Sequence, residues 1–402
     1  MCRPVDHDVG MRTHDPGNAP VARLVSRPVI RFPFPHPRRL TPIVAVIACL
    51  AAGLHAVSVP TASAAVRGYP AVRVAAGAAP APMARQIERV NAWWARTKTF
   101  VPCAGCMVRP PGSSILWTYY RGQGLYPNWV RAARDILRMS ARGNMPALRR
   151  GTAEILAATT VHRLPNGTRF RTIESAYAAP DGQRAPWRDA MGTGLVLTLI
   201  IPALPDTPTP AQSALARTQA QEILNAFGTD YRRGGLTVRG TGRGLWYLEY
   251  AYGNGDRQRV LNGFMQAIAS LHRFQKQADE LGRTDPAWYP LRDLAQDLVK
   301  RGTIEVVRNI SRYDNGDGWS RYSLTRPGRA PQVYHTYHVQ LLERLTAVPY
   351  LPAGHRAVLA RYRDRWNGAA NVAAGGSGPK PAARGAASGP SGRHRSGSPG
   401  PR

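Results

Sequence analysis

Apolar residues recur at three- and four-residue spacing through most of the chain from residue 127 to residue 367. Val260, Phe264, Ile268 and Leu271, for example, would share one face of a helix. The same periodicity predicts eight helices, at 127–143, 147–160, 188–204, 211–228, 259–282, 286–310, 334–348 and 354–367.

Two stretches rich in Val, Thr, Tyr and Trp predict strands instead, at 169–178 and 235–252, and the second has a glycine turn in its middle. The predicted helices follow one another in successive pairs with short connections. We therefore expect a mostly α fold, in which helical hairpins close into an α/α toroid with one or two short β-hairpins. A plain helical bundle is the alternative, and no strict internal repeat indicates a solenoid.

The N-terminal 64 residues have the order of a secretory signal with a long leading region. The pair Arg38-Arg39 precedes an apolar run over 43–59, and the small residues 62–64 follow it. This order predicts a secreted or cell-surface protein. The alternative is an uncleaved N-terminal anchor, which is the one membrane contact that we expect.

Composition divides the rest of the chain. Residues 65–84 are predicted to be a linker, and residues 85–366 a folded domain. Residues 367–402 are rich in Gly, Ala, Pro, Ser and Arg and hold almost no large apolar side chain. Such a segment buries too little apolar surface to offset its chain entropy, so we predict a disordered tail.

The chain is strongly basic, with 54 Lys and Arg against 24 Asp and Glu and a net charge of +30. Residues 85–366 alone hold 40 basic and 21 acidic side chains, a net charge near +19. A field of that sign favours polyanionic partners. Predicted export and the lack of any zinc-finger, recognition-helix or RNP-type pattern argue against nucleic acid. An acidic polysaccharide is the partner that we expect.

Cys103 and Cys106 are the cysteines that follow the predicted signal. In an oxidising compartment this pair favours a small structural disulfide. A redox-active pair is less well supported because no thioredoxin-like pattern surrounds it. A zinc site would need two further ligands, which the neighbouring sequence does not offer, and we expect no metal and no organic cofactor.

Aromatic and charged side chains concentrate in three connections between the predicted helices, at 185–197, 245–265 and 311–342. Loops at one end of a helical scaffold are a common place for a binding cleft. The three connections combine phenols, one glutamate and several guanidiniums. Glycoside hydrolysis needs two carboxylates, and Glu249 has no obvious partner except Asp314 or Asp317, which lie in a turn-like segment.

Proton abstraction from C5 of a hexuronate has different needs. Arginine forks must neutralise the carboxylate next to C5, and an acid and a base must lie on opposite faces of the sugar. Tyrosine can serve once neighbouring cations lower its pKa. Reprotonation from the other face gives epimerisation, whereas loss of the 4-linked sugar gives lyase chemistry. The residue types alone do not choose between the two reactions.

Several short segments carry more specific information: W-x-x-A-M-x-x-G at 187–194, WYLEY at 246–250, VLNGFM at 260–265, YDNGDG at 313–318 and YHTYH at 334–338. In this order they resemble the C-terminal domain of the D-glucuronyl C5-epimerase family, and the resemblance spans roughly residues 120–345. The family's catalytic positions would fall on Glu249, Tyr250, Tyr322 and Tyr334. Tyr337 replaces a threonine of the family motif, so the resemblance implies no chemical role for it.

The resemblance also implies substrate-binding residues. The family arginine has no direct match, and Arg326 or Arg321 would replace it. His335 and His338 would position Tyr334 or the sugar. Further candidates are Trp187 and Trp246, as sugar-stacking platforms or core residues, and Asn262, as a brace for the helix that it begins or as a substrate contact.

Taken together, the resemblance implies an extracytoplasmic enzyme that converts D-glucuronate, or a similar uronate, to L-iduronate within an acidic polysaccharide. The expected route is a two-base mechanism that involves Tyr322 and Tyr334. A uronan lyase and a non-catalytic protein that binds acidic glycans are the alternatives.

Overall fold

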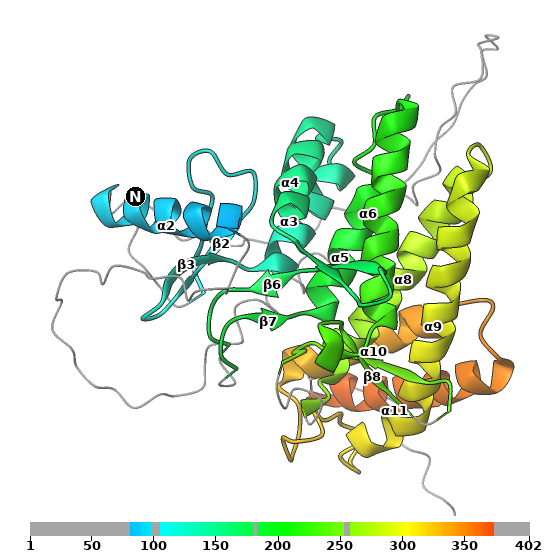
Figure 1. Cartoon of the computed structure of the whole chain (residues 1–402). Coiled ribbons are helices and arrows are strands. Elements are labelled where there is room, and N and C mark those ends of the chain that lie inside the picture. The colour runs from blue at the N-terminus through cyan, green and yellow to red at the C-terminus, as the bar shows by residue number, and fades with distance from the viewer. Residues whose placement is uncertain (1–80, 98–104, 180–182, 241, 253–257, 374–402) are drawn as a thin grey trace, which may run out of the picture.

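The computed structural model describes residues 81–97, 105–179, 183–240, 242–252 and 258–373 (Figure 1). The predicted mostly α fold is confirmed. A helix is present in each of the eight predicted segments: α3 (Trp129–Ala141), α4 (Met145–Ala157), α5 (Ala190–Ile200), α6 (Pro210–Gly228), α8 (Leu261–Gly282), α9 (Tyr289–Asn309), α10 (Gln332–Thr346) and α11 (Ala353–Ala373).

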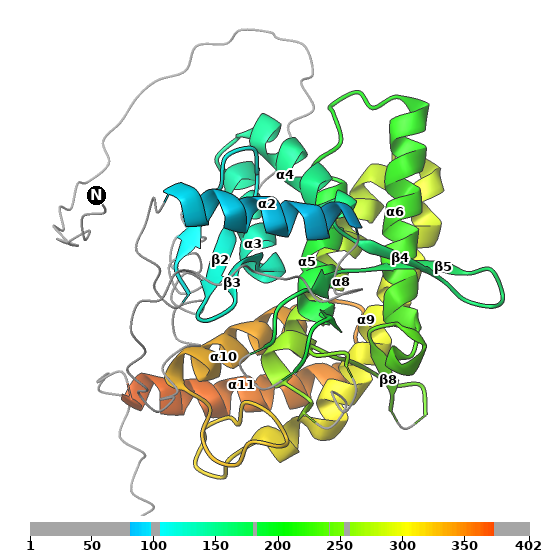
Figure 2. The same cartoon turned by 60° about the vertical axis from the view of Figure 1, so that its left-hand side comes forward.

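The helices form four sequential hairpins, α3–α4, α5–α6, α8–α9 and α10–α11 (Figures 1 and 2). The first helices of these hairpins form one row, because α5 packs against α3 and α8, and α8 packs against α10. In the second row, α6 packs against α9, and α9 against α11. Closure of the hairpins into a toroid stays a prediction.

A segment before the hairpins adds structure that the sequence did not predict. Helix α2 (Ala81–Thr97) lies beside an antiparallel sheet in the order β1 (Met107–Val108), β2 (Trp117–Tyr120) and β3 (Gly124–Pro127). Asn91 joins helix and sheet, because its amide donates to the Leu125 carbonyl and accepts from the Leu125 N–H, both at 2.8 Å. Cys106 is disulfide-bonded, whereas Cys103, its expected partner, lies outside the described residues.

Three hairpins of short strands complete the fold: β4 (Thr160–Arg163) with β5 (Arg169–Thr172), β6 (Glu174–Ser175) with β7 (Trp187–Arg188), and β8 (Thr237–Arg239) with β9 (Leu245–Tyr247). The predicted glycine-turn hairpin within 235–252 is confirmed. The predicted strand 169–178 is split between β5 and β6. Single-turn 3₁₀ helices occur at η3 (Tyr231–Arg233), η4 (Pro286–Trp288) and η5 (Ile310–Tyr313).

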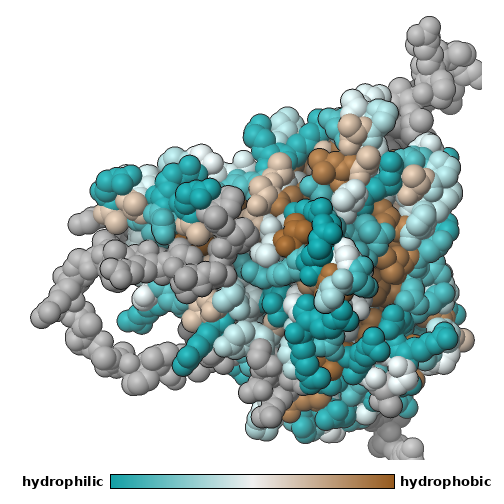
Figure 3. All heavy atoms as spheres, in the orientation of Figure 1, coloured by the Kyte–Doolittle hydropathy of each residue, from teal (hydrophilic) through white to brown (hydrophobic). Residues whose placement is uncertain are grey.

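Helix α5 lies at the centre of the core, and every one of its residues is buried. Glycine allows its close contact with α8, since a Cβ on Gly194 would lie 3.1 Å from the Ser270 side chain. No helix of the described residues is long and apolar enough to cross a membrane. Hydrophilic residues cover most of the face seen in Figure 3.

The first helices of the four hairpins begin close to one another, and this positions the site. Asn128 caps α3 by accepting from the Arg131 N–H, and Asp189 caps α5 by accepting from the Met191 N–H. Helices α8 and α10 start without a side-chain cap. The N-terminal ends of helices carry partial positive charge, so the space between them favours an anion.

Candidate active site

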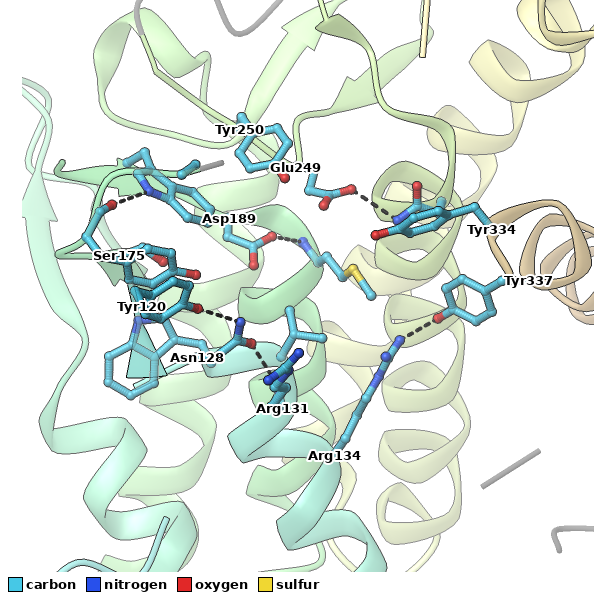
Figure 4. Close-up of a pocket in the computed structure, with 17 residues that line it drawn as sticks. Tyr120, Asn128, Arg131, Arg134, Ser175, Asp189, Glu249, Tyr250, Tyr334 and Tyr337 are labelled. Carbon is cyan, nitrogen blue, oxygen red and sulfur yellow. Dashed lines mark hydrogen bonds between the residues drawn. The ribbon is translucent and has the colours of Figure 1, made fainter. Parts of the chain in front are cut away.

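The first turns of these four helices line a pocket of about 840 Å³, its open mouth included (Figure 4). The strands β2 and β6 and the segment after β9 complete the wall. Its polar lining consists of Tyr120, Asn128, Arg131, Arg134, Ser175, Tyr177, Asp189, Glu249, Tyr250, Asn262, Tyr334 and Tyr337.

Glu249 follows β9 and reaches over the first turn of α8. Its Oε2 accepts from the Asn262 Nδ2 at 3.3 Å, and its side chain is partly exposed. Gly263 makes this approach possible, because a Cβ there would lie 2.2 Å from the Glu249 Oε2. The glycine of the VLNGFM segment therefore leaves room for the carboxylate.

Tyr334 lies in the first turn of α10 and is 6% exposed. Figure 4 shows Tyr334 and Glu249 pointing toward the same space from different elements. The Tyr334 ring meets the ring of Tyr322 edge-on, with centroids 4.8 Å apart. Tyr250 packs against Trp187 with centroids 5.1 Å apart, and the Trp187 Nε1 donates to the Tyr177 carbonyl at 2.8 Å.

Two guanidiniums enter the pocket from α3. The Arg131 Nη1 donates to the Gly105 carbonyl at 2.7 Å, and burial lowers the pKa of Arg131 below its usual value. The Arg134 Nη2 donates to the Tyr337 hydroxyl at 2.7 Å, and that hydroxyl donates to the Gln266 Oε1. Within the part of the chain that the structure describes, neither arginine has a carboxylate within 4.0 Å.

Asp189 and a tyrosine pair form the opposite part of the lining. Burial raises the pKa of Asp189 to about 7, although the N–H groups of Gly192 and Met191 bond to its carboxylate. Tyr120 stacks on Tyr177 with centroids 3.9 Å apart. The Tyr120 hydroxyl accepts from the Asn128 Nδ2 at 2.8 Å, and burial raises the pKa of Tyr120 to about 12.

The structure brings together five of the residues expected from the sequence: Glu249, Tyr250, Tyr334, Trp187 and Asn262. Tyr322 does not line the pocket, and it reaches the site through its ring contact with Tyr334. Asn262 was expected to cap or brace the helix or to contact the substrate; its Nδ2 donates to Glu249, and it does not cap α8.

The two histidines lie outside the pocket lining and are fully buried. The His335 Nδ1 accepts from the Ser320 N–H at 3.1 Å, so its Nε2 carries the proton and donates to the Trp366 carbonyl at 3.0 Å. The His338 Nδ1 bonds to the Ser320 Oγ at 2.8 Å, and burial lowers the pKa of His338 to about 3. Of the two roles expected for the histidines, these bonds favour positioning of Tyr334 over contact with the sugar, because both imidazoles fix the start of α10.

The remaining candidates also lie outside the pocket lining. Trp246 is fully buried and stacks on Phe264 with centroids 3.9 Å apart, so it is a core residue and not a sugar platform. Arg326 lies over the Tyr322 ring, with its Cζ 5.4 Å from the centroid. Neither Arg326 nor Arg321 lines the pocket.

Sequence reasoning missed Arg131, Arg134, Asp189, Tyr120 and Tyr177. The arginines occupy a predicted helix, where charged residues usually form the solvated face. Asp189 lies at the start of a predicted helix, where an acidic residue usually serves only as a cap. A usable signal was present, since Asn128 and Asp189 are both N-cap residues, and the ends of adjacent helices tend to meet.

Comparison with known proteins identifies a family over part of the chain. Residues 169–368 match the family model described as D-glucuronyl C5-epimerase C-terminus. No curated protein matches the chain. The match includes Glu249, Tyr250, Asn262 and Tyr334, and it begins after α3.

Proposed function

The chain belongs over residues 169–368 to the D-glucuronyl C5-epimerase C-terminus family, and from this premise we propose that it inverts C5 of D-glucuronate residues in an acidic polysaccharide, giving L-iduronate. The observation that carries the proposal is the shared pocket of Glu249 and Tyr334. A carboxylate and a phenol from different elements face one space there, next to two guanidiniums.

The chemistry needs a base, an acid and a stabilised anion. Glu249 takes the C5 proton as the C5–H bond breaks, and the electron pair moves into the sugar's own carboxylate group. Tyr334 then donates its phenolic proton to C5 from the other face, and a new C5–H bond forms with inverted configuration. Proton exchange with solvent restores both groups, so the reaction is an isomerisation with no oxidant or reductant.

In this proposal the pair is Glu249 and Tyr334, and not Tyr322 and Tyr334. Tyr322 contacts the ring of Tyr334 without lining the pocket, so it would orient that ring. Tyr250 packs on Trp187 and would form the wall against which the sugar lies. A positioned acid or base contributes roughly 10²- to 10⁴-fold to a rate, which is the scale expected for each of the two groups.

We also propose that the enzyme works outside the cytoplasm on an anionic glycan. The secretory-type order of residues 1–64 supports the location, and the net charge of +30 supports the partner. The partial positive charge of the helix N-termini around the pocket is complementary to an anionic partner.

The test is product analysis. The purified full chain is incubated with heparosan, a polymer of alternating glucuronate and N-acetylglucosamine, and with other glucuronate polymers. Iduronate signals in the proton NMR spectrum support the proposal, and Glu249→Gln should reduce their rate of appearance by at least about 10²-fold. A rise in ultraviolet absorbance, which marks an unsaturated uronate, would identify a lyase. Binding with neither change would identify a non-catalytic glycan-binding protein.

A further inference from the structure

The two arginines of α3 are unusual because they bring positive charge into the pocket, whereas no carboxylate of the described residues lies within 4.0 Å of either guanidinium. Arg131 is 8% exposed, and transfer of an unpaired guanidinium from water is costly. Its local side-chain bond is to a neutral carbonyl, that of Gly105. A buried cation of this kind is expected where a ligand supplies the anion.

Arg134 is held in place by a short relay of neutral groups. The Tyr337 hydroxyl accepts from its Nη2, and Gln266 on α8 accepts from that hydroxyl. The guanidinium Cζ also lies 5.4 Å from the Tyr337 ring centroid. A guanidinium has five N–H donors. The described residues use one side-chain donor of Arg134 in this relay, so further donors stay available to a ligand.

The carboxyl groups of the pocket do not cancel these charges. Glu249 bonds to Asn262, and the pKa of Asp189 near 7 leaves this group partly protonated at neutral pH. The pocket therefore sets two guanidiniums against the carboxyl groups of Glu249 and Asp189, and the second of these is only partly ionised. One further carboxylate, that of a bound uronate, brings the site close to neutrality.

We propose that Arg131 and Arg134 together bind the carboxylate of the uronate residue that enters the pocket, and so select uronates over neutral sugars. This inference rests on the proposed function for the identity of the sugar. In this proposal the arginines of α3 bind the carboxylate, in place of an arginine from the loop that holds Arg321 and Arg326. This explains how the site can bind a uronate although the family arginine has no direct match in the chain.

Two consequences follow. Bound guanidiniums stabilise the negative charge that develops on the carboxylate when C5 loses its proton, so the arginines affect the rate as well as binding. In addition, α3 (Trp129–Ala141) lies before the matched residues 169–368. The matched domain thus supplies Glu249 and Tyr334, whereas the preceding segment supplies the specificity for acidic sugars.

The experiment compares two probes with the full chain: a heparosan hexasaccharide and the same hexasaccharide with its carboxyl groups reduced to alcohols. Affinities are measured by calorimetry for wild type, Arg131→Met and Arg134→Met. Arg142→Met is the matched control, because Arg142 is the exposed C-cap residue of the same helix and lies outside the pocket lining. Melting temperatures show whether each variant folds.

Wild type should bind the acidic hexasaccharide at least about tenfold more tightly than the reduced one. Each pocket variant should lose about ten- to hundredfold in affinity for the acidic probe, the scale of charged hydrogen bonds, and change little toward the reduced probe. Arg142→Met should keep the preference. Two further variants perturb the site less. Arg134→Lys keeps the positive charge, and Tyr337→Phe removes the hydroxyl that accepts from the guanidinium. For both, the affinity for the acidic probe should lie between those of wild type and Arg134→Met.

The inference is overturned if wild type binds the two probes equally or binds neither, or if the pocket variants keep the wild-type preference. Different results would overturn the proposed function. If the preference depends on the two arginines but no iduronate forms, the carboxylate site stands and the epimerase assignment falls. If iduronate forms while the arginine variants keep the wild-type preference for the acidic probe, the epimerase assignment stands and the carboxylate site falls.

Discussion

Tyr334→Phe is the sharpest perturbation of the proposed mechanism, because it deletes one hydroxyl and keeps the ring. The ring is 6% exposed and meets Tyr322 edge-on at 4.8 Å, a packing that phenylalanine preserves. Loss of the proton donor should lower kcat by about 10²- to 10⁴-fold. Since each factor of ten is about 1.4 kcal/mol, this is roughly 3 to 6 kcal/mol of transition-state stabilisation.

The same change should leave binding and stability nearly intact. We expect substrate affinity to change by less than about tenfold, and the free energy of unfolding by about 1 kcal/mol. The assay is the initial rate of iduronate formation at several substrate concentrations, with calorimetric affinity and denaturant unfolding measured on the same preparations.

A suitable control removes a buried phenol outside the pocket. Tyr247 fits, because its hydroxyl donates to the Leu298 carbonyl at 2.7 Å and it is absent from the lining. Tyr247→Phe should lose about 1 kcal/mol of stability and keep its kcat. The family motif has threonine at position 337, so the resemblance implies no chemical role for Tyr337. Tyr337→Phe is nevertheless an unsuitable control, because the Tyr337 hydroxyl accepts a hydrogen bond from Arg134. A kcat for Tyr334→Phe within about threefold of the Tyr247→Phe value would refute the role of Tyr334 in proton transfer.

Three further predictions follow from the site and its surroundings. Gly263→Ala should lower kcat by at least about tenfold, because its Cβ would displace Glu249, whereas Gly228→Ala, with open space around it, should not; steady-state rates decide. The stability of Asp189→Asn relative to wild type should rise with pH. Burial raises the pKa of Asp189 from 3.8 to about 7, so the stability that the protonated carboxyl gives wild type is fully present below about pH 4 and is lost as pH rises through 7. Urea unfolding at each pH should show a relative gain of at most about 4 kcal/mol for the variant, and a difference in unfolding free energy that does not change with pH would contradict the prediction. Trp246→Ala should cost about 3 to 5 kcal/mol of unfolding free energy, as a core residue does, and a loss under 1 kcal/mol would favour a surface platform.

The helices were predictable because each buries an apolar stripe, and that stripe sets the sequence period. Helix α5 shows the limit of this signal, since it is buried on all sides and its period is weak. The sheet β1–β3 escaped prediction because its strands are two to four residues long, too short for a period-two pattern to be seen. Strand β4, which begins at the last residue of a predicted helix, was missed for the same reason.

At the site, ordered motifs located Glu249, Tyr250 and Tyr334, because unusual residue types recur there in a known order. The roles of charged residues on regular helices could not be predicted in the same way. Periodicity places Arg131 and Arg134 on a polar face, but only the three-dimensional packing shows that this face lines a pocket. The histidines were expected to position Tyr334 or the sugar, and only the packing shows that they lie outside the pocket lining, where the His335 Nε2 donates to the Trp366 carbonyl of α11.

The central claim is proton exchange at C5 without cleavage of the chain. The most direct measurement is incubation of the full chain with heparosan in deuterated water, followed by NMR of the uronate C5 position. The account predicts deuterium at C5 of both glucuronate and iduronate, at a rate that falls in Glu249→Gln and Tyr334→Phe, with no change in polymer length. A folded wild-type protein that binds the polymer and leaves C5 fully protonated would contradict it.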